Sequence, residues 1–133
     1  MSKKQKASQG PQAWMYNAKY LGGHAAFAKE AVGKLYLYPQ PDNKVVFESR
    51  LVNMQIPLSS VTDSKVVTEK ELSAARVFLV GILAFAWKKK TRMLLIEYKD
   101  NLGSTQTPIF EPQKVEDAAS KLYEMRQQFK MKS

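Results

Sequence analysis

The chain contains no cysteine and a single histidine. The lack of cysteine excludes disulfides, zinc-thiolate sites and cysteine nucleophiles, and it fits a cytoplasmic protein. His24 has no acid or nucleophile beside it at the spacing of a known catalytic motif, and the scattered carboxylates form no metal-ligand cluster. We therefore expect no enzyme activity, no metal and no cofactor, with His24 in an ordinary hydrogen bond.

Long apolar segments are also missing. No window reaches the roughly 18 apolar residues that a membrane-spanning helix needs. The N-terminal MSKKQKASQGPQ is basic but precedes no apolar signal core. With 133 residues, of which 44% are hydrophobic, the chain has enough apolar material for one core. We expect a soluble protein that is not secreted, with a flexible basic leader over residues 1–13 and one domain over residues 14–130.

The excess positive charge is unevenly placed. The net charge is +9, and three acid-free clusters carry +3, +4 and +3, while the other 11 basic and 12 acidic residues sum to −1. An anionic partner would therefore meet local patches rather than a uniformly basic body. The alternative is that the lysine-rich ends only keep the protein soluble. The clusters are Lys3, Lys4 and Lys6; Lys88, Lys89, Lys90 and Arg92; and Arg126, Lys130 and Lys132.

Alternation of polar and apolar residues predicts short strands over most of the chain. Two prolines and an Asp-Asn pair in PQPDN predict a hairpin between residues 34–38 and 44–48. Pro57 predicts an edge position or a strand end for its strand, and Pro108 predicts an edge or a bulge. Residues 24–33 fit either a helical turn or a loop. The predicted strands are residues 16–21, 34–38, 44–48, 53–58, 64–69, 91–100 and 104–110.

Beyond Glu111 the apolar period changes from two to 3.6 and predicts one amphipathic helix of about 16 residues. Pro112 suits its first turn, and Glu116 and Asp117 lie near the positive end of the helix dipole. Such a helix needs a sheet to cover its apolar stripe. The residues of this stripe are Val115, Ala118, Ala119, Leu122, Met125 and Phe129.

The order of these segments resembles the prokaryotic pleckstrin-homology-like superfamily, especially GRAM-like domains. The resemblance covers nearly the whole chain after residue 13. It implies an α+β fold in which a partly open antiparallel barrel of about seven strands is capped by one C-terminal helix. The matching segments are YLGGH (20–24), GKLYLYPQPDNKVVFES (33–49), IPLSSV (56–61), VGILAFAWKKKTRMLLIEYKD (80–100) and VEDAASKLYEMRQQ (115–128).

Families with this fold bind phosphoinositides, other anionic lipids or peptides, so the fold alone does not specify a ligand. Lipid-binding members often carry a basic pattern around the first two strands. Lys19, Lys29 and Lys34 lie in that region here, but no arginine completes the pattern. The tryptophan common in the final helix is also missing. These departures from the family pattern argue against a specific inositol-phosphate pocket.

The stretch VFLVGILAFAWKKK joins eleven residues without a polar side chain to three lysines. Exposed, it would place Phe78, Phe85 and Trp87 in a lipid interface beside the basic side chains. Buried, it would form a strand and bend of a small barrel, or a subunit contact. The sequence favours burial for most of the stretch, with a basic corner where it ends.

We therefore expect a noncatalytic binding module at anionic lipid surfaces, cytoplasmic and peripheral at the inner face of the membrane. Lys88, Lys89, Lys90 and Arg92 are its main basic residues, assisted by Lys19, Lys29 and Lys34, with Phe78, Phe85 and Trp87 as apolar contacts. The alternative is a protein-interaction or homo-oligomerisation module that meets its partner through part of residues 77–87 or through the strand holding Pro108. Nucleic acid is not expected as a partner, because no recognition motif accompanies the tyrosines.

Overall fold

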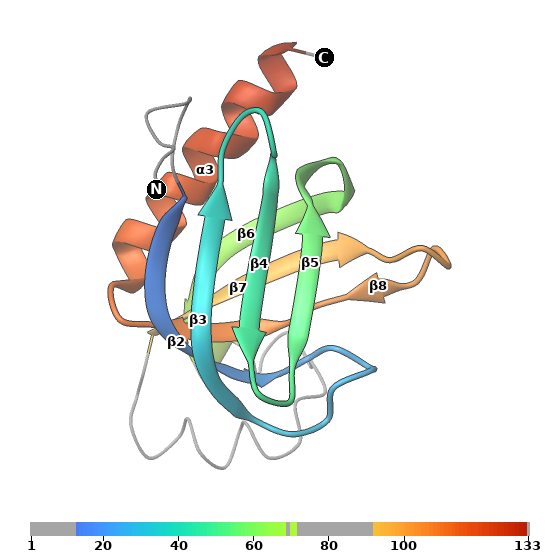
Figure 1. Ribbon diagram of the computed structural model, residues 1–133, viewed down its shortest axis with the longest axis vertical. Coiled ribbons are helices and arrows are strands. Elements are labelled where there is room, and N and C mark those ends of the chain that lie inside the picture. Colours follow the sequence, from blue (N-terminus) through green and yellow to red (C-terminus); the bar gives the residue numbers. More distant parts are fainter. Residues whose placement is uncertain (1–12, 69, 72–91, 133) are drawn as a thin grey trace, which may run out of the picture.

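One antiparallel sheet that curls on itself and one C-terminal helix make up the protein (Figure 1). The computed structural model describes residues 13–68, 70–71 and 92–132. The sheet order is β5-β4-β3-β2-β9-β7-β6, and β8 pairs with β7 beside this path. The elements are β2 (Trp14–Gly22), β3 (Ala31–Tyr38), β4 (Lys44–Ser49), β5 (Asn53–Pro57), the 3₁₀ turn η1 (Leu58–Ser60), β6 (Val61–Thr68), β7 (Arg92–Lys99), β8 (Thr105–Gln106), β9 (Ile109–Pro112) and the helix α3 (Val115–Lys132).

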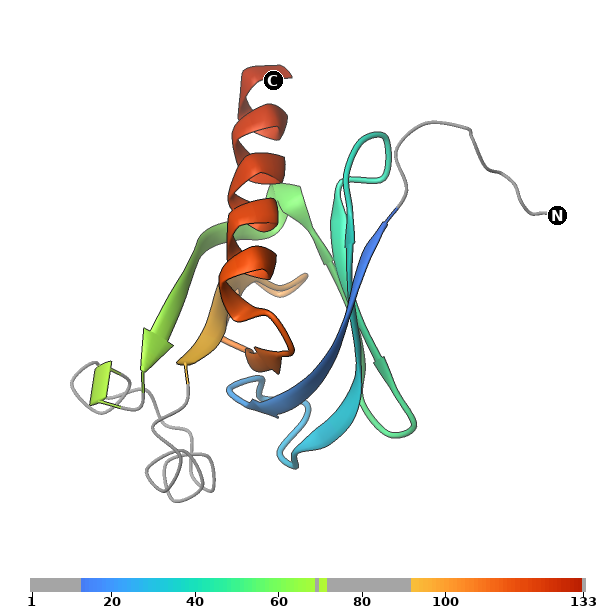
Figure 2. The same cartoon turned by 90° about the vertical axis from the view of Figure 1, so that its left-hand side faces the viewer.

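β2 joins the two halves of the sheet. Along its first part it pairs with β3, and its second part also pairs with β9, with a shift of register between Tyr20 and Gly22. The positive φ of Gly22, 130°, is accessible to glycine and suits this bend. Strands β2 to β5 therefore cross β6 and β7 at a steep angle (Figures 1 and 2). This shape confirms the predicted partly open antiparallel barrel with one capping helix.

The core fills the space between the two halves and the helix. Tyr20, Phe47 and Phe110 have at most 1% of their surface exposed, and their rings contact one another. The helix stands beside the opening between the halves (Figure 2) and adds Leu122 and Met125 to the same cluster. Each fully buried large side chain contributes roughly 1.5–3 kcal/mol. The apolar stripe predicted on the helix is therefore the surface that closes the core.

The predicted hairpin is present between β3 and β4. Its turn is closed by the amides of Asp42 and Asn43, which both donate to the carbonyl of Pro39 at 3.0 and 3.1 Å. Asn43 has a φ of 52°, a left-handed conformation that asparagine tolerates better than most residues. Leu35 faces Phe47 across the pair, so the hairpin places one side of each strand in the core.

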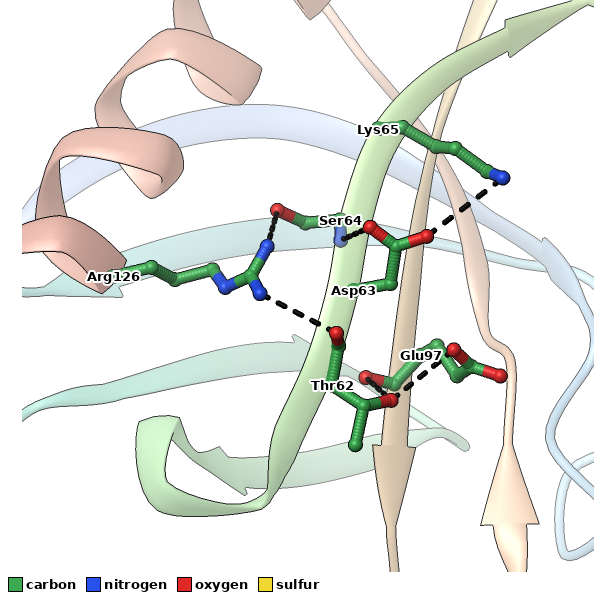
Figure 3. Close-up of polar contacts among 6 residues, drawn as sticks. All are labelled: Thr62, Asp63, Ser64, Lys65, Glu97 and Arg126. Atoms are coloured by element: carbon green, nitrogen blue, oxygen red, sulfur yellow. Dashed lines mark hydrogen bonds and ion pairs between the residues drawn. The ribbon is translucent and has the colours of Figure 1, made fainter. Parts of the chain in front are cut away.

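Polar contacts fix the helix to the sheet on both sides. The Tyr16 hydroxyl donates to Asp117 at 2.6 Å, and burial together with this carboxylate raises the pKa of Tyr16. The same hydrogen bond lowers the pKa of Asp117. On the other side, Arg126 donates to the Ser64 hydroxyl at 2.9 Å and to the Thr62 carbonyl at 3.4 Å (Figure 3). Arg126 thus contacts the edge of β6 that pairs with no other described strand.

Several sequence predictions need correction. The edge that Pro108 suggested is wrong for β9, because residues 104–110 divide into β8 and β9, on either side of Pro108, and β9 lies between β2 and β7. The Pro108 carbonyl accepts from the amide of Ile96 at 3.1 Å, in the gap between the two strands. Pro112 ends β9 instead of starting the helix. The edge predicted from Pro57 is confirmed, since β5 ends the sheet and Pro57 ends β5.

Candidate functional site

The predicted basic corner is only partly within the described residues. Lys88, Lys89 and Lys90 lie outside them, as do the apolar contact candidates Phe78, Phe85 and Trp87. Arg92 is described: it opens β7, and its guanidinium forms an ion pair with the Glu116 carboxylate of α3. Arg92 therefore has a partner in the contact between helix and sheet.

The other three predicted lysines lie close to one another in the sheet register. Lys19 on β2 faces Val32 on β3, and Lys34 on β3 faces Asn17 on one side and Glu48 on the other. Lys29 is exposed in the connection from β2 to β3, two residues before β3 begins. The structure thus brings these residues to one end of β2 and β3.

The turn from β4 to β5 adds two residues that the sequence analysis missed. Ser49 closes this turn, since its amide donates to the Val52 carbonyl at 3.0 Å and its hydroxyl accepts from the Val52 amide at 2.8 Å. Val52 is buried, which leaves Arg50 and Leu51 exposed between them. The signal was an apolar residue in a turn, but single exposed leucines are common on protein surfaces.

We call Lys29, Val32, Lys34, Arg50 and Leu51 the loop end. Lys19, which faces Val32 from β2, lies beside it. Gly33 pairs with Ser49, so the β4–β5 turn lies beside the start of β3. Leu51 is 83% exposed and Val32 is 75% exposed. The β2–β3 and β4–β5 connections lie at the same end of the molecule in both views (Figures 1 and 2). Two apolar side chains here are therefore open to contact from outside.

The charge of the loop end is close to balanced. Lys29, Lys34 and Arg50 form no ion pair within the described residues. Glu30 and Glu48 lie among them, so three positive and two negative groups leave a local charge of +1. This charge alone gives little attraction at physiological salt. Any strong attraction to an anionic surface needs basic residues beyond the loop end.

Hydrogen bonds of His24 hold the β2–β3 connection against the rest of the sheet. Its Nδ1 accepts from the Ala26 amide at 3.0 Å, so Nε2 carries the proton and donates to the Tyr98 hydroxyl at 2.7 Å. The Tyr20 hydroxyl accepts from the His24 amide at 3.1 Å and donates to the Phe27 carbonyl. This histidine holds the connection that carries Lys29, in keeping with the ordinary hydrogen bonding that the sequence predicted.

The stability of the protein is expected to fall in mild acid through His24. Burial lowers the pKa of His24 below its ordinary 6.5, against an opposing effect of Asp100. The unfolded chain then binds the proton more readily, so stability is highest above pH 6.5 and falls as the pH drops toward the lowered pKa. Urea unfolding between about pH 7.5 and about pH 5 measures this. A His24→Gln variant with the same loss over this interval would contradict it, since the chain has no other histidine.

Two further kinds of feature are absent from the described residues. They contain no group of three or more histidine, cysteine, aspartate or glutamate side chains able to hold a metal ion. Nor does the described part of the chain contain a helix with the length and apolarity of a membrane span. The loop end is one described surface that combines exposed apolar and basic groups.

Comparison with known proteins identified no relative. No protein-family model, curated protein or solved structure matched the chain.

Proposed function

We propose that this protein is a noncatalytic, pleckstrin-homology-like binding module that associates peripherally with anionic lipid surfaces. The observation that carries the proposal is the loop end, where Leu51 and Val32 are largely exposed beside Lys29 and Arg50. An apolar side chain flanked by basic ones fits the boundary between lipid headgroups and acyl chains. The residues that contact the surface in this proposal all lie in connections or at strand ends.

The apolar part of the association comes from Leu51 and Val32. Full burial of a side chain of this size contributes roughly 1.5–3 kcal/mol. Both belong to the short segments next to the Gly33–Ser49 pair, so their backbones lie at the same end of the sheet. Two such side chains give reversible, weak attachment on their own.

The electrostatic part comes from Lys88, Lys89 and Lys90, because the loop end has a charge of only +1. A basic residue near an anionic surface contributes about 1 kcal/mol. In Figure 2, β6 ends and β7 begins at the lower left of the molecule, the β2–β3 connection lies at its lower middle and the β4–β5 connection at its lower right. The three lysines precede β7 in the sequence by one residue, Thr91. Arg92 has its partner in Glu116 and is left out of the surface.

Leu51→Ser is expected to weaken binding to vesicles of mixed neutral and anionic lipid about tenfold, since a loss of about 1.4 kcal/mol corresponds to that factor. Leu102→Ser is the matched control, because Leu102 is 90% exposed in the turn between β7 and β8, away from the loop end. Sedimentation with vesicles measures both variants. Equal binding by the two variants would show that the loop end does not contact the lipid.

The same preparation separates this proposal from a protein-interaction module. A module that only binds itself or another protein gives no sedimentation with vesicles of either composition. Self-association through the free edge of β5 would appear in light scattering as a mass that rises with concentration. A concentration-independent monomer that sediments with anionic vesicles supports the lipid proposal over this alternative.

A further inference from the structure

The two edges of the sheet differ in their protection against pairing with a further strand. An exposed edge accepts another strand unless a bulge, charged side chains or a covering element prevents it. The edge strand β6 has all three kinds of protection. Its pairing with β7 shifts register between Val61 and Asp63, and Asp63 and Lys65 carry charge. Arg126 of the helix also donates to its Thr62 carbonyl, so this edge is guarded.

Within the described residues, the edge of β5 lacks these devices. β5 ends the sheet order, pairs with β4 in an unbroken register and contains no charged residue (Figure 1). Its side chains alternate, since Met54 and Ile56 are buried whereas Asn53 and Gln55 are exposed. Pro57 protects only the last position, where it removes one amide. Among the described strands, β5 is therefore the open end of the sheet.

The register decides which backbone groups of β5 are left unpaired. In an antiparallel ladder, bonded pairs alternate with unbonded ones. The Leu58 amide donates to the Asn43 carbonyl at 2.9 Å, just beyond the last pair of β4 and β5. In steps of two from Leu58, Ile56 and Met54 bond to β4, and the backbone groups of the residues beside them point away from it. The outward groups are the amides and carbonyls of Asn53 and Gln55 and the carbonyl of Pro57.

We propose that the edge of β5 pairs with the same edge of a second copy of the protein, antiparallel and with the two-fold axis at Gln55. In this register Gln55 faces Gln55 of the second copy, and Asn53 faces Pro57 in both directions. Each outward amide of one copy donates to an outward carbonyl of the other, and the missing amide of Pro57 leaves no donor unpaired. The edge is thus self-complementary, as a symmetric pair requires.

The charges beside the edge match in the same register. On β4, Lys44 pairs with Pro57 and Glu48 pairs with Asn53. The row of the joined sheet that begins with Lys44 of one copy therefore ends with Glu48 of the second copy, and the symmetric row does the same. An unrelated strand meets this order of charges only by chance. A second copy is accordingly the occupant that this edge favours.

The pairing goes beyond the proposed lipid association and does not depend on it. Because the paired strands run in opposite directions and the β4–β5 turn precedes β5, the two loop ends lie at opposite ends of the joined sheet. The pair is weak, with an expected dissociation constant of about 0.1–1 mM, because its backbone hydrogen bonds replace hydrogen bonds to water. It is therefore tested in the absence of lipid and at high protein concentration.

Charge exchange at the two-fold axis tests the pairing directly. Gln55→Glu and Gln55→Lys each bring like charges face to face, so either variant alone is expected to dissociate several-fold more readily than the wild type. An equimolar mixture of the two variants brings opposite charges face to face and is expected to pair at least as tightly as the wild type. Sedimentation equilibrium of the full chain at up to about 2 mM measures the mass in each sample.

Two further pairs of variants serve as controls. Gln55→Pro removes an outward amide without removing a hydrogen bond to β4 and is expected to abolish pairing while the protein stays folded in urea titrations, whereas Gln55→Thr keeps the amide and the pairing. Gln128→Glu and Gln128→Lys exchange charge at an exposed position of the helix, and their mixture is expected to gain nothing. A wild type that stays monomeric up to about 2 mM would overturn the proposal. So would a Gln55 mixture that pairs no better than its separate components, or an equal gain in the Gln128 mixture.

Discussion

Gly33→Ala is expected to lower the free energy of unfolding by about 3 kcal/mol. A Cβ at this position would lie 2.1 Å from the carbonyl oxygen of Glu48 and 2.8 Å from the Cβ of Ser49. Both contacts are to the neighbouring strand β4, and the backbone there is held by the buried pair Leu35 and Phe47 two residues away. The added methyl group therefore forces β3 and β4 apart at the loop end. Urea unfolding of the variant and the wild type measures the loss.

Gly103→Ala is the control for this prediction. Gly103 has a φ of +84°, which an alanine adopts at a cost of about 1 kcal/mol, but nothing lies within 4 Å of its Cβ position. The stability lost by this variant therefore measures the cost of the backbone conformation alone, without a steric clash. If Gly33→Ala destabilised the protein no more than Gly103→Ala does, the close approach of β3 and β4 would be contradicted. The position of the β4–β5 turn beside the start of β3 would then need another explanation.

Replacing Lys88, Lys89 and Lys90 together by glutamine is expected to weaken binding to anionic vesicles about 100-fold. The three charges contribute about 1 kcal/mol each at an anionic surface, and about 1.4 kcal/mol corresponds to a factor of ten. The loss is expected to shrink as salt is added, because screening already weakens the wild-type attraction. Vesicle sedimentation over a range of salt concentrations measures it.

A second triple variant controls for net charge. Lys44, Lys99 and Lys114 lie on β4, on β7 and just before the helix, away from the loop end and spread over the surface. Their replacement by glutamine removes the same charge and is expected to change binding only a few-fold. Equal losses in the two variants would mean that overall charge attracts the protein and that the lysines before β7 have no special part.

Local patterns in the sequence predict most of the strands and the helix. The alternation of Leu94, Ile96 and Tyr98, and the turn chemistry of residues 39–43, act within a few residues and are visible without the fold. The order of the strands is not local. β9 lies between β2 and β7 because Tyr20 and Leu94 both pair with Phe110, and neither pairing follows from the segment around Pro108. The edge predicted for that strand was wrong for this reason.

In the candidate site, too, local sequence predicts some residues, whereas others are brought together only by the fold. Lys19, Lys29 and Lys34 were chosen from the sequence, and the sheet register brings them to one end. Arg50 and Leu51 were missed, because only the pairing of Gly33 with Ser49 puts their turn beside the start of β3. Arg92 looked available in the sequence, but its partner Glu116 comes from the helix. Long-range pairing therefore decides which basic and apolar groups share a surface.

Sedimentation of the wild-type protein with vesicles tests the central claim most directly. Neutral vesicles and vesicles with anionic lipid are compared at low and at high salt. We expect strong binding only to anionic vesicles at low salt, with a weaker residual from Leu51 and Val32 when the charge is screened. Equal and negligible binding to both kinds of vesicle at low salt would contradict the claim that this protein is a module for anionic lipid surfaces.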